Sequence, residues 1–216
     1  MTKKLLEMVR EEENIKFLEI LDKSFDIGNS IGIKMIELCE LIKKSNEHFN
    51  LTSITKLEDM LSKHIFDSLS IKHLVSGKNI LDIGSGAGLP GIPLALSAPD
   101  SNFFLLDSNN KKIIFLNHVK ISLEIENIFP KHDRVENFDS DVHFDTIVCR
   151  SYASLAKIYL NSKKYTDNGG KIIAMKGKMP KEEIAELKKV AGKVECKIEK
   201  LMIPGLAAER HAVIIN

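Results

Sequence analysis

The apolar positions of this 216-residue chain follow one spacing up to about residue 76 and another beyond it. In the first part, apolar residues recur every three or four positions, which is typical of the buried face of an α-helix. One broken helical stripe begins with Leu5, Leu6, Val9 and Glu13, and a second, apolar one runs through Ile31, Met35, Leu38 and Ile42. We therefore expect a helical extension over residues 1–76 and a main domain over residues 77–216, packed together as one compact unit.

A third helix is marked shortly before the spacing changes. Thr55 and Glu58 match a capping box, in which two side chains satisfy the free N–H groups at a helix start. Apolar residues then recur at helical spacing, at Met60, Leu61, Ile65 and Leu69. The preceding segment, residues 46–53, is polar and irregular, and it predicts a loop.

Beyond residue 77, short apolar runs alternate with helical patterns. Strands are expected at 79–83, 103–107, 144–149 and 171–175, and helices at 89–96, 111–123 (capped by Ser108 or Asn109), 155–165 and 181–191. Two last runs, 194–203 and 211–215, are expected to pair antiparallel at a sheet edge. Continuous apolar strands between helices indicate an α/β fold, with a mostly parallel sheet covered on both faces.

The run 79–83 leads directly into the glycine-rich loop Gly84-Ser85-Gly86-Ala87-Gly88. Ligands of open α/β sheets bind beyond the carboxyl ends of the strands, so this loop is the first candidate site. A dinucleotide fingerprint, G-x-G-x-x-G, spans residues 86–91, with Asp107 at a suitable distance for a ribose hydroxyl. Counted from Gly84, which follows the strand, the pattern is G-x-G-x-G, with Leu89 in place of the fingerprint's last glycine. A P-loop is excluded, because no G-x-x-x-x-G-K-[ST] occurs.

Two carboxylates favour a cationic ligand at this loop over a pyrophosphate. Asp82 stands near the end of the strand before the glycines, and Asp107 ends the next strand. S-adenosylmethionine carries an ammonium, a sulfonium and a ribose diol but no phosphate, which suits two acidic side chains. Asp82 would face its amino acid part, and Asp107 would accept both ribose hydroxyls.

The residues of the loop leave other interpretations open. Asp82 could instead cap the loop, and Asp107 the next helix. An NAD-dependent oxidoreductase and a non-catalytic S-adenosylmethionine-binding protein are therefore alternatives to a methyltransferase.

Composition adds limits on the class of protein. Hydrophobic residues make up 44% of the chain, yet no apolar run approaches the roughly 20 residues that span a bilayer. The first residues lack the apolar block of a signal peptide, so we expect a cytoplasmic protein without membrane contact. The three cysteines form no C-x-x-C pair and the histidines show no metal-ligand spacing, so we expect neither a disulfide nor a metal site.

The charge is unevenly distributed along the chain. The net charge is only +1, but residues 145–216 hold 14 basic and 8 acidic residues, a local charge of +6. Such a segment could face a polyanion. A solvated, lysine-rich surface explains it equally well, since 27 of the 31 basic residues are lysine.

An ordered set of short blocks makes the chain resemble the small-subunit ribosomal RNA methyltransferase G family, also called glucose-inhibited division protein B. The blocks lie at residues 50–54, 63–69, 81–93, 106–108, 134–136, 149–155, 175–177 and 209–211. Each block alone is weak, whereas the ordered set is specific and covers nearly the whole chain. The family usually has alanine where this chain has Ser151, which leaves the geometry beside Arg150 open.

The resemblance implies a class I S-adenosylmethionine-dependent methyltransferase, a Rossmann-like fold with an N-terminal helical extension. It implies methylation of guanine N7 at position 527, in the 530 loop of 16S ribosomal RNA. The partner is then 16S rRNA or the small ribosomal subunit, and nothing in the sequence requires more than a monomer. The expected cofactor-binding residues are Asp82, Gly84, Gly86, Leu89, Asp107, Ser108, Val135, Glu136 and Arg150.

Methylation at guanine N7 depends on alignment rather than on acid–base chemistry. N7 has an in-plane lone pair and no proton, so its attack on a methyl group needs positioning and no general base. No catalytic residue is assigned, and Arg150 and Lys176 are the candidates because they lie at strand ends and carry charge. The candidates for contact with RNA are His64, Asp67, Lys176 and Arg210.

Plainer roles remain open for several of these residues. His64 and Asp67 lie at i and i+3, so they share a helix face and could simply bond to each other. Arg150 could form a structural ion pair, and Lys176 could be a solvated loop lysine.

Overall fold

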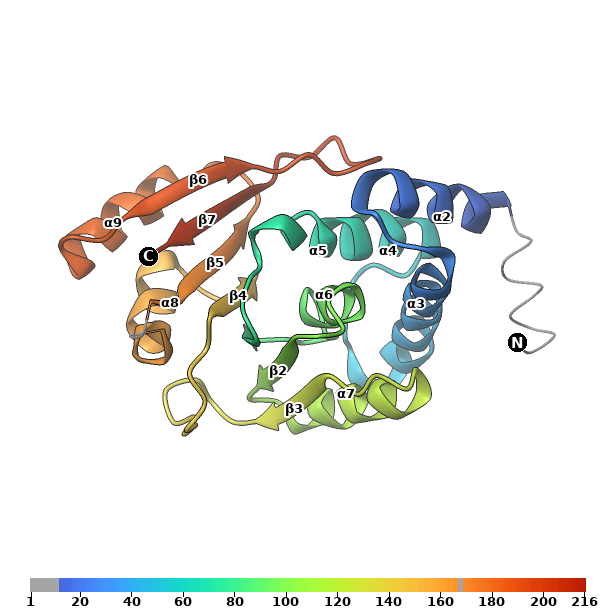
Figure 1. The fold of residues 1–216 in the computed structure, drawn as a ribbon, viewed down its shortest axis with the longest axis horizontal. Helices are drawn as coiled ribbons and strands as arrows, with labels where there is room; N and C mark the ends of the chain where they lie inside the picture. The colour runs from blue at the N-terminus through green and yellow to red at the C-terminus, as the bar shows by residue number, and fades with distance from the viewer. Residues whose placement is uncertain (1–11, 167–168) are drawn as a thin grey trace.

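Seven strands form one twisted sheet in the order β3-β2-β1-β4-β5-β7-β6 in the computed structural model, which describes residues 12–166 and 169–216 (Figure 1). The strands are β1 (Asn79–Ile83), β2 (Asn102–Asp107), β3 (Ile128–His132), β4 (Thr146–Arg150), β5 (Lys171–Lys176), β6 (Cys196–Lys200) and β7 (His211–Ile215). Strands β1 to β5 pair parallel, whereas β7 runs antiparallel to both β5 and β6. The predicted parallel sheet with an antiparallel edge is confirmed.

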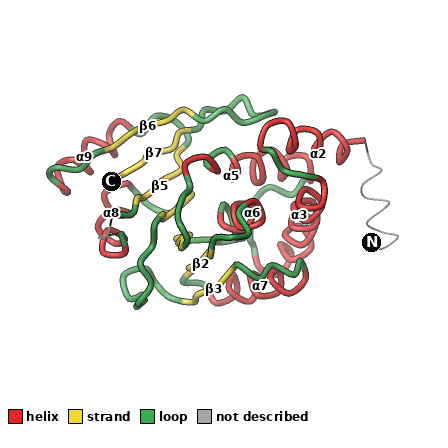
Figure 2. The backbone as a smooth tube through the Cα atoms, viewed as in Figure 1, coloured by secondary structure: helices red, strands yellow, loops and turns green. Residues whose placement is uncertain are grey.

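Helices surround the sheet, as Figure 2 shows in red. They are α2 (Glu12–Phe25), α3 (Asn29–Phe49), α4 (Leu57–Met60), the π-helical turn η1 (Leu61–Phe66), α5 (Asp67–Leu69), the 3₁₀ turn η2 (Lys72–Leu74), α6 (Gly91–Ser97), α7 (Asn110–Ser122), α8 (Leu155–Ser162), the 3₁₀ turn η3 (Lys163–Tyr165) and α9 (Lys181–Ala191). The predicted stripe at residues 5, 6 and 9 lies outside the described residues.

Two hydrophobic clusters cover the two faces of the sheet. Alternate residues of a strand point to opposite faces of the sheet. In β1, Ile80 therefore belongs to the cluster formed with α3, α6 and α7, whereas Leu81 belongs to the cluster formed with α8 and α9. Leu105 and Leu106 of β2 divide in the same way. Burial on both faces is the reason that these strands read as continuous apolar runs.

The N-terminal helices pack against the first of these faces. Met35, Leu38 and Ile42 of α3 are fully buried in the same cluster as Ile80. The Lys34 ammonium donates a hydrogen bond of 2.7 Å to the carbonyl of Leu123, at the end of α7. The segment formed by η1 and the start of α5 lies at the carboxyl end of β4, where Arg150 bonds to Lys63 and Asp67.

Two details before β1 differ from the sequence prediction. The polar segment 46–53 was expected to be a loop, but α3 continues to Phe49 and ends at Asn50 in the left-handed conformation (φ 49°). The next helix starts after Lys56 without a side-chain cap, so the predicted capping box at Thr55 and Glu58 is wrong. After α3 the chain is held back against this helix, because the Asn46 amide exchanges two 2.8 Å hydrogen bonds with the backbone of Thr52.

Strand β3 was not predicted. Its sequence, Ile-Phe-Pro-Lys-His, contains a proline and two polar residues and shows no apolar run. Proline lacks the N–H that a central strand needs, but it is tolerated on an edge strand. Pairing with β2 therefore decides the conformation of this segment, and β3 lies at the edge of the sheet.

Candidate active site

Two adjoining cavities lie at the carboxyl ends of the central strands. The larger has a volume of about 580 Å³ and the smaller about 350 Å³. Gly84, Lys112 and Ser151 line both cavities, so the two meet at the glycine loop and the end of β4. Parallel sheets commonly bind their ligands at this edge.

The glycine loop folds over the end of β2. The N–H groups of Gly84 and Ser85 both donate to the carbonyl of Leu106, at 2.8 and 3.1 Å. Gly84 has a φ of 72°, and a β-carbon there would lie 2.8 Å from the Tyr152 ring, so only glycine fits without strain. Gly86 and Leu89 continue the loop along the wall of the larger cavity.

Asp107 ends β2 with its side chain largely buried at the wall of the smaller cavity. One carboxylate oxygen accepts a 2.9 Å hydrogen bond from the N–H of Gly86, and the other accepts one of equal length from Asn109. The Lys112 ammonium lies 3.7 Å away. Asp107 thus ties the glycine loop to the start of α7, while Asn109 caps that helix, as predicted.

The far side of the smaller cavity comes from the segment after β3. Val135 and Glu136 line it together with Asp107 and Ser108, which all come from the predicted cofactor-binding set. The Tyr165 hydroxyl shares its one proton between the carbonyls of Val135 and Phe138, whose oxygens lie 2.8 and 2.5 Å away, and so anchors this segment.

Asp82 lies beneath the loop, in the wall of neither cavity. It is 1% exposed, and its Oδ2 accepts a 3.0 Å hydrogen bond from the N–H of Gly91 at the start of α6. Its Oδ1 is buried without a hydrogen-bond partner among the described residues. Burial raises the pKa of the Asp82 carboxyl to about 7, and the Gly91 hydrogen bond and the Arg150 charge offset only part of this effect.

The buried Asp82 carboxyl makes protein stability depend on pH. Its folded pKa exceeds its unfolded value, so it contributes stability that is present below about pH 4 and is lost as the pH rises through about 7. Asparagine cannot ionise, so between pH 5 and 8 the free energy of unfolding of Asp82→Asn should fall less steeply than that of the wild type. The two slopes should differ by up to about 1.4 kcal/mol per pH unit. Denaturant titrations across this range measure the difference. Asp141→Asn, at an exposed position, is the control; equal slopes for wild type and Asp82→Asn would contradict the prediction.

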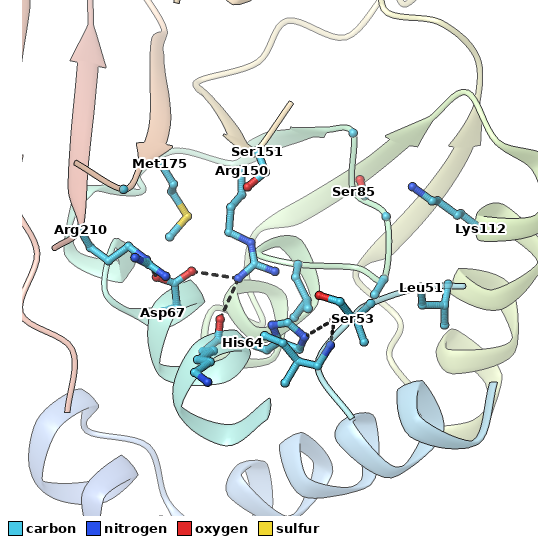
Figure 3. A pocket seen from close by; sticks show the side chains of 18 of the residues that line it. Leu51, Ser53, His64, Asp67, Ser85, Lys112, Arg150, Ser151, Met175 and Arg210 are labelled. Carbon is cyan, nitrogen blue, oxygen red and sulfur yellow. Dashed lines mark hydrogen bonds and ion pairs between the residues drawn. The ribbon is translucent and has the colours of Figure 1, made fainter. Parts of the chain in front are cut away.

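Asp67 binds two arginines in the larger cavity (Figure 3). Its Oδ2 lies 2.9 Å from Nη1 of Arg150 and its Oδ1 3.0 Å from Nε of Arg210. Arg150 also donates a 3.2 Å hydrogen bond to the carbonyl of Lys63. The Asp67 carboxylate at the start of α5 therefore connects the end of β4, through Arg150, with the residue before β7, Arg210.

His64 lines the same cavity from the π-helical turn η1. It is 6% exposed, with Nε2 2.9 Å from the Thr52 hydroxyl and Nδ1 buried without a hydrogen-bond partner among the described residues. Burial, and secondarily the charge of Arg150, lowers the pKa of His64 to about 4. The imidazole is therefore neutral at neutral pH. His64 and Asp67 both face the cavity, but each bonds to a different partner.

Lys176, at the end of β5, lines the larger cavity with its charge already paired. Its ammonium lies 2.7 Å from the Glu183 carboxylate and donates a 2.8 Å hydrogen bond to the carbonyl of Ala153. Ser151 follows Arg150 in the left-handed conformation, with a φ of 53° that non-glycine residues seldom adopt. The departure from the usual alanine thus lies at a tight bend where the two cavities meet.

Sequence reasoning missed Lys112, Thr52 and Tyr152. Lys112 lies on α7 five positions after Asp107, and only the fold turns it back toward the glycine loop. Thr52 and Tyr152 belong to blocks that carried the family resemblance, residues 50–54 and 149–155, and that resemblance was the signal available for them. Within the described residues there is no group of acidic, histidine and cysteine side chains that could hold a metal ion, and no helix is long and apolar enough to cross a membrane.

Comparisons with known proteins point in one direction. The model of the family "rRNA small subunit methyltransferase G" matches residues 32–213. The protein named ribosomal RNA small subunit methyltransferase G from Legionella pneumophila (strain Lens) is 40% identical over 206 residues, 94% of this chain and 97% of its own length. That of Methylococcus capsulatus is 39% identical over 86% of this chain and 89% of its own length.

Solved structures show the same fold at low sequence identity. The METTL16 methyltransferase domain superposes with a TM-score of 0.60 at 14% identity, covering 86% of this chain and 96% of that domain. A precorrin-6y C5,15-methyltransferase from Geobacter metallireducens gives 0.54 at 16% identity, covering 79% and 95%. The fold is therefore that of class I methyltransferases, with N-terminal helices added.

Proposed function

Because this chain belongs to the rRNA small subunit methyltransferase G family, we propose that it methylates N7 of a guanine in the 530 loop of 16S ribosomal RNA. S-adenosylmethionine is the methyl donor. The single observation that carries this proposal is family membership over nearly the whole chain. Two joined cavities, one lined by Asp107 and the other by two arginines, support it.

The smaller cavity fits the adenosyl part of the cofactor. Its volume of about 350 Å³ is within the range of small-molecule sites. Asp107 is the acceptor for the ribose hydroxyls, Ser108, Val135 and Glu136 border the adenine, and Gly84, Gly86 and Leu89 form the backbone wall for the methionine part. Bound there, S-adenosylmethionine supplies an electrophilic methyl group on a sulfonium. Asp82 acts from beneath, through its hydrogen bond to Gly91.

The larger cavity is the place for the target guanine and its flanking RNA. Guanine N7 carries a lone pair and no proton, so the chain has to align the base and need not deprotonate it. His64, neutral at neutral pH, offers a hydrogen-bonding group without charge. Arg150 and Arg210 share one carboxylate, that of Asp67, and so leave a net positive charge along the same wall, whereas the Lys176 ammonium is paired with Glu183. Arg150 lines this cavity directly before Ser151, one of the residues at which the two cavities meet.

A direct experiment tests the proposed function. The chain is incubated with labelled S-adenosylmethionine and either 16S RNA or small ribosomal subunits, and the labelled nucleotide is mapped. We expect label at N7 of one guanine in the 530 loop; the more active substrate identifies the natural partner. Absence of transfer to either form would favour a non-catalytic binding protein. Calorimetry with S-adenosylhomocysteine and NADH tests the oxidoreductase alternative, which binding to NADH alone would support.

RNA binding should depend steeply on salt. The charge of +6 over residues 145–216 suggests several phosphate contacts, and each releases counterions. For single-stranded RNA, six such contacts give a slope of about −4 in a plot of log affinity against log salt. Filter binding between 50 and 300 mM KCl measures it, with S-adenosylhomocysteine binding as the control. A flat dependence for RNA would contradict the basic segment's role. In the cell, we propose a monomer acting in the cytoplasm.

A further inference from the structure

The hydrogen bonds of Arg150 and Arg210 occupy only some of the N–H donors of each guanidinium group. Each arginine carries five N–H donors in a rigid planar fork. Arg150 spends Nη1 on Asp67 and on the carbonyl of Lys63, and Arg210 spends Nε on Asp67 and Nη1 on the carbonyl of Glu209. Within the described residues, Nε and Nη2 of Arg150 and Nη2 of Arg210 make no hydrogen bond. Both side chains line the larger cavity, so these donors are available to an anion there.

Two guanidinium groups would not remain together without a countercharge. Their side chains are 17% and 27% exposed, so water screens their mutual repulsion incompletely. The Asp67 carboxylate, 4% exposed, lies between them and gives one oxygen to each. The three groups retain a net charge of +1, which one phosphodiester would neutralise.

We propose that Asp67 is a positioning residue for methyl transfer, which holds Arg150 and Arg210 so that their free donors bind one phosphodiester of the RNA beside the target guanine. This inference rests on the proposed function. Guanidinium groups bind phosphate oxygens through paired, parallel hydrogen bonds, which require a fixed orientation. Asp67 supplies that orientation from the N-terminal extension, to arginines 83 and 143 residues away in sequence.

A general electrostatic role for Asp67 predicts a different result. Removing a carboxylate from an RNA-facing cavity adds positive charge, which by itself strengthens RNA binding. A purely structural role would lower stability without changing the rate of the folded protein. A positioning role instead lowers the rate of methyl transfer in a folded protein, even though the cavity has become more positive.

The first experiment compares Asp67→Asn with Asp59→Asn. Asp59 is a matched control, because it also pairs with a basic residue (Lys63, 2.7 Å) from the same helical segment, but its side chain is 42% exposed and lines neither cavity. We expect kcat at saturating RNA to fall at least about tenfold in Asp67→Asn, while the Kd for S-adenosylhomocysteine changes less than about threefold. Asp59→Asn should change neither beyond about threefold. An unchanged kcat with a lower KM for RNA would overturn the proposal.

The cofactor measurement separates two kinds of anion. If the arginines hold the carboxylate of S-adenosylmethionine instead of an RNA phosphate, Asp67→Asn weakens cofactor binding as much as it slows transfer. That outcome would also overturn the proposal. Wild-type activity on 16S RNA, measured in the same series, tests the proposed function itself. If the wild type transfers no methyl group, both proposals fail. If the wild type is active and Asp67→Asn has the same kcat, the proposed function stands and only the role of Asp67 is wrong.

A double-mutant cycle shows whether Asp67 acts through Arg210. In the Arg210→Gln background, Asp67→Asn should cost less in kcat than it does in wild type, because the partner it orients is gone. If the fold-decrease in kcat of the double variant equals the product of the two single fold-decreases, Asp67 does not act through Arg210 and the proposal is overturned. Should Asp67→Asn fail to fold, Arg210→Gln, at a more exposed side chain, must by itself lower kcat with an unchanged cofactor Kd; a normal kcat there would refute the proposal.

Discussion

Asp107→Ala should weaken the binding of S-adenosylmethionine about 100-fold or more, because the variant loses two hydrogen bonds from ribose hydroxyls to a charged acceptor, each contributing about 1.5–3 kcal/mol. The side chain is largely buried at the wall of the smaller cavity, where such bonds are poorly replaced by water. The substitution also frees the N–H of Gly86, so the glycine loop loses one of its anchors. Calorimetry with S-adenosylhomocysteine measures the affinity.

Two comparisons sharpen this prediction. Asp100→Ala removes the same charge at an exposed position before β2, away from both cavities, and should leave the affinity unchanged. Denaturant unfolding of Asp107→Ala in the absence of cofactor measures how much stability the lost loop anchors contributed. Wild-type affinity in Asp107→Ala would remove Asp107 from the cofactor site.

Gly91→Ala should lower the free energy of unfolding by about 3 kcal/mol, near the upper end for an overpacked core position. A β-carbon at this position would lie 2.4 Å from Cδ2 of Leu105 and 2.6 Å from Oδ2 of Asp82. Leu105 can shift at its far end, but Asp82 is short, buried and bonded to the same Gly91 N–H. Gly91→Val should be worse. Denaturant unfolding at constant pH measures both.

Gly177→Ala is the matched control for Gly91→Ala. No atom lies within 4 Å of a β-carbon built at Gly177, and its φ is outside the left-handed region. Its stability should stay within about 0.5 kcal/mol of wild type. Because alanine is a better helix former than glycine, helix propensity alone would make Gly91→Ala stabilising. A stable Gly91→Ala would therefore show that Asp82 and Leu105 yield freely.

Local pattern was sufficient for most of the elements. Strands β1, β2, β4 and β5 were predicted from their apolar runs, which arise because both faces of the sheet are covered. Helix α9 was predicted at its observed bounds, Lys181–Ala191. The local sequence pattern predicted neither strand β3 nor the π-helical turn η1. The first takes its conformation from pairing with β2, and the second continues a helix whose apolar spacing alone does not distinguish π from α geometry.

The sequence by itself determined the strands other than β3, the glycine loop and the carboxylate that ends β2, because strand periodicity, glycine content and a strand-end acid are local properties of the chain. Only the tertiary structure decided which charges meet. Asp82 stands two residues before Gly84, yet its buried carboxylate accepts a hydrogen bond from Gly91 and lines neither cavity. Asp67 bonds to both Arg150 and Arg210 because the sheet order brings the end of β4 and the start of β7 close together, with only β5 between them. Partners separated by 83 and 143 residues follow from the order of strands in space, which no local pattern encodes.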